Sequence, residues 1–95
     1  MAEYIRLAKL LRELESLAPE CRAFFRVLSL FLENPDEAFT KYRVEKETAL
    51  SHVARVLERM VSMGVLEIVD ENPRLYRLNK QSPFLQHLLE PLVKA

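Results

Sequence analysis

The sequence contains a single glycine, Gly64, and the spacing of the apolar residues changes at this position. Before it, apolar residues recur at helical intervals, which predicts a helix over residues 51–63 with Ser51 as its N-cap and an inward face of Val53, Val56, Leu57, Met60 and Val61. After it, residues 65–69 and 75–78 are strand-like and flank a turn-rich stretch at 70–74. Glycine fits the left-handed position that ends helices. The chain is therefore expected to pass abruptly from a helix into a β-hairpin.

Further helices are expected on both sides of this segment. Residues 3–17 are amphipathic and stop before Pro19, whereas residues 20–33 are apolar around nearly the whole helix, which is typical of a central core helix. Residues 83–93 carry another leucine stripe, with Ser82 as the expected N-cap and Pro91 expected to limit or kink the helix.

A short polar helix is expected between the central helix and the turn at residues 48–51. An Asn-Pro-Asp turn at residues 34–36 should end the central helix, and residues 38–39 should form a short extended piece. Thr40 is the expected N-cap of a helix over residues 41–47. Tyr42 and Val44 are expected to be its main apolar contacts.

The charge of the chain is balanced overall but not locally. Its 14 basic and 14 acidic side chains give a net charge of zero, so the whole protein has no electrostatic attraction to nucleic acid. Residues 39–63, however, hold five basic side chains against three acidic ones, a surplus of two. The basic excess therefore falls on the two helices that surround the 48–51 turn.

Several classes of function find no support in the residues. With one glycine there is no phosphate-cradling loop, and no nucleophile–base arrangement is recognisable, so neither an enzyme nor a bound cofactor is expected. Cys21, His52 and His87 are too few for a zinc site, and Cys21 is expected to be an ordinary core residue. No stretch approaches the ~18 apolar residues of a membrane span, and the first residues lack the order of a secretory signal, so a cytoplasmic protein is expected.

The segment from residue 40 to residue 66 resembles the winged helix-turn-helix of ArsR- and MarR-like transcription regulators. The turn Thr48-Ala49-Leu50-Ser51 is similar to the family's Thr-Gly-Leu-Ser turn, and residues 57–66 (LERMVSMGVL) match the end of its recognition helix and the start of its wing. Residues 75–79 with Pro83 and Phe84 resemble the second wing strand and the closing helix. Two departures, Ala49 for the turn glycine and Glu45 for a small residue, lie where the angle between the two helices is set.

The resemblance implies a mainly α (α+β) fold and one domain over residues 1–95. A helix at 3–17 would precede a helical core at 20–64 that contains the helix-turn-helix at 40–63. The wing hairpin would occupy residues 65–79, and a C-terminal helix residues 83–94. The family's metal-binding clusters of cysteine and histidine are absent from this sequence, so metal sensing is not implied.

The resemblance also implies sequence-specific binding of double-stranded DNA. The residues that would face the bases are Ser51, His52, Arg55 and Arg59. His52 is equally compatible with a surface position that has no role in binding. The residues that would contact phosphates are Thr40, Lys41, Arg43, Lys46, Arg74 and Arg77.

Two questions about partners stay open at this stage. The leucine stripes of the first and last helices predict a homodimer with an interface formed by Leu7, Leu11, Leu14, Leu85, Leu88, Leu89 and Leu92. Asp70 and Glu71 make the expected wing tip acidic, which disfavours close approach to phosphates. Either the wing stands away from the duplex, or the chain is a winged-helix module that binds protein and does not contact DNA.

Overall fold

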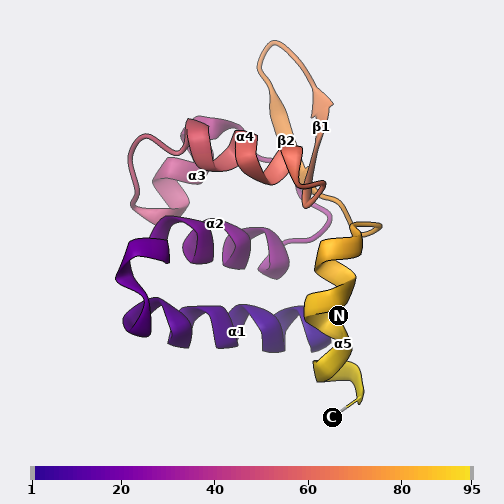
Figure 1. Cartoon of the computed structure of the whole chain (residues 1–95). Helices are drawn as coiled ribbons and strands as arrows, with labels where there is room; N and C mark the ends of the chain where they lie inside the picture. Colours follow the sequence, from indigo (N-terminus) through magenta and orange to yellow (C-terminus); the bar gives the residue numbers. More distant parts are fainter. Residues whose placement is uncertain (1, 95) are drawn as a thin grey trace.

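The protein has a mainly helical α+β fold with one small antiparallel hairpin (Figure 1). The computed structural model describes residues 2–94, except the side chains of residues 91–94. The elements in chain order are α1 (Ala2–Leu17), a 3-10 turn (Pro19–Cys21), α2 (Arg22–Glu33), α3 (Lys41–Thr48), α4 (Ala54–Ser62), β1 (Leu66–Asp70), β2 (Leu75–Leu78) and α5 (Pro83–Lys94). The expected order of elements is therefore confirmed.

The helices are stacked on either side of α2. α1 lies alongside α2 on one side, α3 and α4 lie on the other, and α5 packs against α1 (Figure 1). Val27, Leu28, Phe31 and Leu32 of α2 are completely buried, as expected for a central core helix. The core continues into α4 through Leu57 and Met60.

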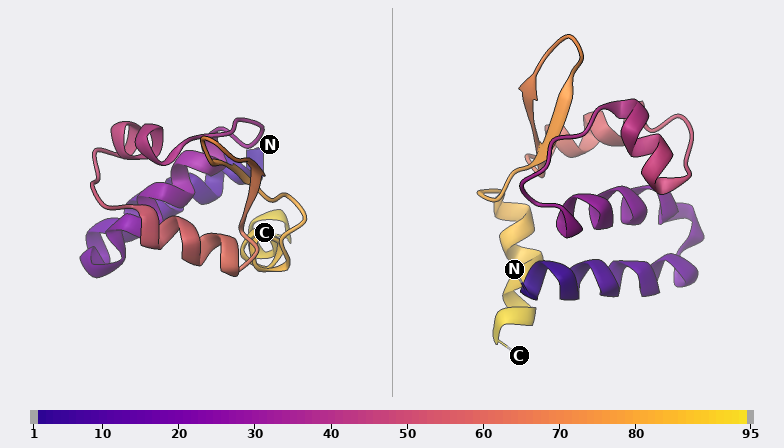
Figure 2. Two further views of the ribbon diagram at one scale, coloured as in Figure 1. Left: turned by 90° about the horizontal axis from the view of Figure 1, so that it is seen from above. Right: turned by 180° about the vertical axis from the view of Figure 1, so that it is seen from behind.

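The hairpin is joined to the segment before α3 through its second strand. β1 pairs with β2 in antiparallel register, with Leu66 opposite Leu78 and a shift in register between Ile68 and Asp70. Phe39 and Tyr76 exchange two main-chain hydrogen bonds of 2.8 Å, so the expected extended piece before α3 forms a bridge to β2. Figure 2 shows this connection from α2 to α3 passing beside the hairpin.

Local caps explain where three of the elements begin or end. Thr40 Oγ1 accepts a hydrogen bond of 3.2 Å from the Arg43 N–H, and Ser82 Oγ accepts one of 3.1 Å from the Leu85 N–H, so both expected N-caps are confirmed. Gly64 follows α4 with a φ of +79°, the left-handed conformation that ends the helix. α5 continues through Pro91 to Lys94, so the expectation that this proline limits the helix is wrong.

The leucines expected at a dimer interface lie mostly inside the molecule. Leu7, Leu11, Leu85 and Leu89 are at most 5% exposed and belong to the core, so their assignment to an interface is wrong. The physical reason is that α1 packs on α2 and on α5, which covers both stripes within one chain. Leu14 and Leu88 pack partly against the same core, and the side chain of Leu92 lies outside the described residues.

Two further expectations about burial are wrong. Cys21 is exposed because it ends the short 3-10 turn between α1 and α2, away from the faces that pack. Tyr42 is 74% exposed, whereas Val44 and Thr48 are buried. Val44 and Thr48 are four residues apart and share one face of α3, so Tyr42, two residues before Val44, lies on the opposite face.

Candidate nucleic-acid interface

The turn between α3 and α4 is longer than the sequence indicates. α4 begins at Ala54, not at Ser51, and Val53 is its N-cap residue without a side-chain hydrogen bond. Ser51 and His52 lie in the turn, and His52 has a φ of 59°. The expectation that Ser51 caps the helix and that His52 lies within it is therefore wrong. A left-handed residue at position 52 cannot belong to a right-handed helix.

The turn needs two residues in the left-handed region. Ala49 ends α3 with a φ of 58° and a ψ of 29°, the conformation for which the resembled family uses glycine. The chain therefore keeps the turn geometry at some conformational cost, because a Cβ disfavours this region. His52 tolerates it better, since histidine is enriched among left-handed residues.

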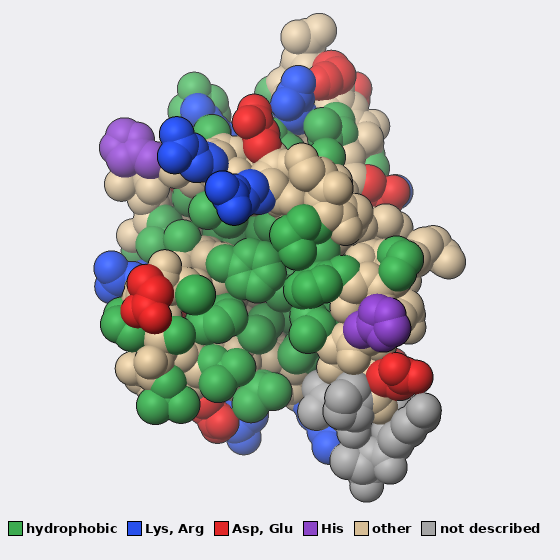
Figure 3. Space-filling model, in the orientation of Figure 1, with side chains coloured by type: hydrophobic (Ala, Val, Ile, Leu, Met, Phe, Trp, Pro, Cys, Tyr) green, Lys and Arg blue, Asp and Glu red, His purple; other side chains and the backbone are tan. Residues whose placement is uncertain are grey.

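Arg55 and Arg59 lie on the outer face of α4. They are one helical turn apart, so they project from the same side of the helix, and both are exposed. Among the side chains that the structure describes, those of residues 2–90, neither has an ion-pair or hydrogen-bond partner. Figure 3 shows Lys and Arg side chains gathered with a histidine over α4. Ser51 and His52 are also exposed, at the start of this face.

The residues expected to contact phosphates differ in their availability. Lys46 is exposed and without a partner within the described part of the chain, and Lys41 Nζ lies 4.9 Å from the centre of the Tyr42 ring. In contrast, Arg43 is ion-paired with Glu37, Arg74 with Glu71 and Arg77 with Glu67. A carboxylate therefore offsets each of these three arginines, which weakens their attraction for phosphate.

A groove between the start of α3 and the hairpin brings several of these residues together. It has a volume of about 280 Å³ and is lined by Thr40, Lys41, Tyr42, Pro73, Arg74 and Tyr76. Arg74 is held here by Glu71, whose side-chain hydrogen bond raises the pKa of the arginine, with a smaller contribution from the Tyr76 side chain. The exposed Tyr42 is a candidate for this surface that the sequence interpretation missed.

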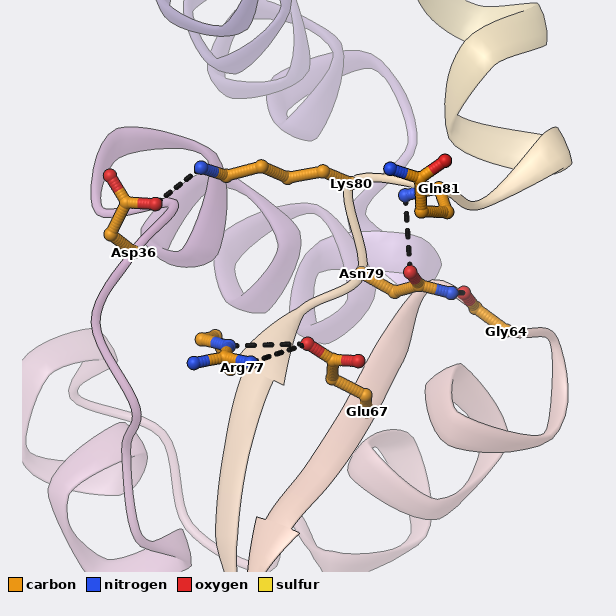
Figure 4. A network of polar contacts seen from close by, with 7 residues as sticks. All are labelled: Asp36, Gly64, Glu67, Arg77, Asn79, Lys80 and Gln81. Carbon is orange, nitrogen blue, oxygen red and sulfur yellow. Dashed lines mark hydrogen bonds and ion pairs between the residues drawn. The ribbon is translucent and has the colours of Figure 1, made fainter.

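Arg77 lies elsewhere, at the base of the hairpin. It donates to Glu67 Oε2 at 3.0 and 3.1 Å across the two strands (Figure 4). A second pocket of about 280 Å³ at this base also contains the ion pair between Lys80 and Asp36. The charged side chains of this pocket are paired with one another, and Arg77 is not among the residues that line the groove at α3.

Comparisons with known proteins identify no family for this chain. No family model matches the chain, and no curated protein or solved structure is significantly similar to it. Among residues 2–94 there is no group of histidine, cysteine and acidic side chains able to hold a metal ion. The described helices also include none that is long and apolar enough to cross a lipid bilayer.

Proposed function

We propose that the chain is a winged helix-turn-helix protein that binds double-stranded DNA in a sequence-specific manner, with α4 as the recognition helix and the hairpin as the wing. The observation that carries this proposal is the exposed pair Arg55 and Arg59. Two guanidinium groups that have no partner among the described side chains, on one face of a short surface helix, are suited to bidentate contacts with guanine in the major groove.

The surroundings of α4 support a division of roles. Ser51 and His52 precede the helix and would enter the groove beside its N-terminus. Lys46, Lys41 and Thr40 lie on or before α3 and would contact the phosphates that flank the groove. The guanidinium groups of Arg43, Arg74 and Arg77 would contribute less, since their charges are already paired.

We propose that the protein acts as a homodimeric transcription regulator. The interface differs from the buried leucine stripes: it would use the exposed edge of α1, where Leu10 is 40% and Leu17 is 78% exposed. Apolar side chains gather over α1 and α2 below α4 (Figure 3). Two-fold symmetry would place the two recognition helices about 34 Å apart on a palindromic site.

Selection of bound sequences from a random duplex pool tests the proposal directly. The expected result is an enriched palindrome, and the logarithm of the affinity should fall linearly with the logarithm of the salt concentration, by about 0.9 per phosphate neutralised. The double variant Arg55→Ala/Arg59→Ala is the control for specific recognition. A protein that enriches no sequence and ignores duplex DNA at low salt would exclude the proposed function.

A second candidate function is supported by the outer strand of the hairpin. Ile68 and Val69 of β1 are 39% and 38% exposed, and the hairpin tip carries Asp70 and Glu71. A winged-helix module that binds protein through this strand would keep its partner in the Arg55→Ala/Arg59→Ala variant and lose it in Ile68→Asp. The opposite pattern would remove this alternative.

A further inference from the structure

The start of α4 lacks a cap of its own. A helix leaves its first main-chain N–H groups without partners inside the helix. At α4 the N-cap residue, Val53, has no side chain able to accept these hydrogen bonds, and Ser51 lies too early in the turn to replace it. An acceptor for these N–H groups must therefore come from outside α4.

Two side chains from other helices hold the turn at its two ends. Glu45 of α3 accepts a hydrogen bond of 3.3 Å at Oε2 from the Val53 N–H. Arg26 of α2 donates through Nη1 to the Thr48 carbonyl oxygen at 3.3 Å. The first contact spans the turn from α3 to α4, and the second ties the end of α3 to the central helix.

Glu45 is suited to this position by its charge as well as its reach. The N-terminus of a helix carries a partial positive charge, which a nearby carboxylate stabilises. Glu45 is half-buried, so its carboxylate is less screened by water than that of the exposed Glu47 on the same helix. The residue that departs from the small side chain of the resembled family thus supplies the cap that α4 lacks.

We propose that Glu45 is a positioning residue for DNA recognition: by capping α4 from α3 it fixes the angle between the two helices, and hence which base pair Arg55 reaches. This inference rests on the proposed DNA binding. Glu45 does not itself contact DNA in this proposal, and its carboxylate acts through the Val53 main chain.

The test compares three variants with the unmodified protein. Glu45→Ala removes the acceptor and the charge, and Glu45→Gln keeps an acceptor of the same length without the charge. Glu47→Ala removes the same charge from an exposed side chain that has no partner among the described residues. Each variant is titrated with the selected duplex and with a scrambled duplex at one salt concentration.

Glu45→Ala is expected to lower the ratio of specific to non-specific affinity by about tenfold, the loss of one misplaced base contact. Glu45→Gln is expected to restore this ratio to within about twofold, because an amide oxygen also accepts the Val53 N–H. Glu47→Ala should change both affinities together and leave their ratio unaltered. Equal ratios in Glu45→Ala and Glu47→Ala would overturn the proposal.

A measurement without DNA separates this proposal from the proposed function. Hydrogen exchange of the Val53 amide should become faster in Glu45→Ala but not in Glu47→Ala, and residual dipolar couplings should report a changed angle between α3 and α4. If the unmodified protein binds no duplex while these two changes occur, DNA binding fails and the capping role stands. If neither change occurs, the capping role is wrong whether or not the protein binds DNA.

Discussion

Nε of Arg26 lies 2.7 Å from Oε1 of Glu15, in an ion pair that joins α2 to α1. The side chains are only 32% and 18% exposed, and the same guanidinium also donates to the Thr48 carbonyl oxygen. Arg26 therefore connects α1, α2 and the end of α3 through one side chain.

Replacing Arg26 by methionine is expected to lower the free energy of unfolding by about 2 kcal/mol, because a poorly solvated carboxylate and a carbonyl oxygen lose their donor. Arg12→Met is the matched control. Its ion pair with Glu33 is 52% and 37% exposed, so its loss should cost less than about 1 kcal/mol. Urea unfolding measures both values, and equal losses would contradict the structural role of Arg26.

Ala49→Gly is expected to stabilise the protein by about 0.5 to 1 kcal/mol. Glycine removes the strain of a Cβ at a φ of 58°, and this gain exceeds the added flexibility of the unfolded chain. Ala23→Gly, within α2, should instead destabilise by about 1 kcal/mol. Thermal and urea unfolding of both variants test the prediction, and two losses of similar size would mean that residue 49 is not strained.

Leu85→Ala is expected to destabilise each chain by about 2 to 5 kcal/mol, since Leu85 is completely buried in the core. His87→Ala, on the same helix and with a side chain that is 81% exposed, should change the stability by less than about 0.5 kcal/mol. Unfolding is measured at two protein concentrations tenfold apart. If the loss of stability in Leu85→Ala disappears at the higher protein concentration, Leu85 lies at a subunit interface and not in the core of one chain.

Arg55→Ala and Lys46→Ala should impair DNA binding in different ways. Loss of Arg55 is expected to remove about 1 to 3 kcal/mol of discrimination at one base position. Loss of Lys46 should weaken binding to all duplexes alike and reduce the salt slope by about 0.9. Affinities for the selected site and its single-base variants, each measured across a salt series, separate the two. Identical profiles would show that Arg55 does not contact a base.

Glu71→Gln is expected to strengthen DNA binding. The change removes an acidic group from the hairpin tip and releases Arg74 from its ion pair, so one further phosphate contact becomes available. The salt slope should then steepen by up to about 0.9. Asp36→Asn, at the opposite end of the hairpin and also ion-paired, is the control. An unchanged slope in Glu71→Gln would mean that the hairpin tip stands away from the duplex.

The sequence predicts the elements of this fold well, because their signals are local. Apolar spacing gives the helices, and Thr40, Ser82 and Gly64 each fix a helix end within one turn of the chain. The start of α4 differs from the sequence prediction because its signal is not local. Its cap comes from Glu45, eight residues earlier, and no rule about neighbouring residues anticipates an acceptor from another helix.

Which side chains cover or pair with one another depends on tertiary packing, and local sequence signals do not predict it. An apolar stripe shows that Leu7 or Leu89 will be covered, but not whether the cover is another helix of the same chain or a second molecule. Likewise, the pairing of Arg77 with Glu67 follows from the strand register, which places the two residues directly opposite one another. The helical spacing of α3 did contain the information that Tyr42 faces outward, since Val44 and Thr48 define its inner face.

The hairpin is closed at its base by contacts that do not involve its tip. The Asn79 side chain donates to the Gly64 carbonyl oxygen at 2.8 Å (Figure 4). The Asn79 N–H donates to the Val65 carbonyl oxygen at 2.9 Å. Loop closure costs rise only slowly with loop length once the ends are held together. Extra residues inserted between Asp70 and Leu75 should therefore leave the helical body intact, which makes this tip a natural grafting point for a loop of foreign sequence.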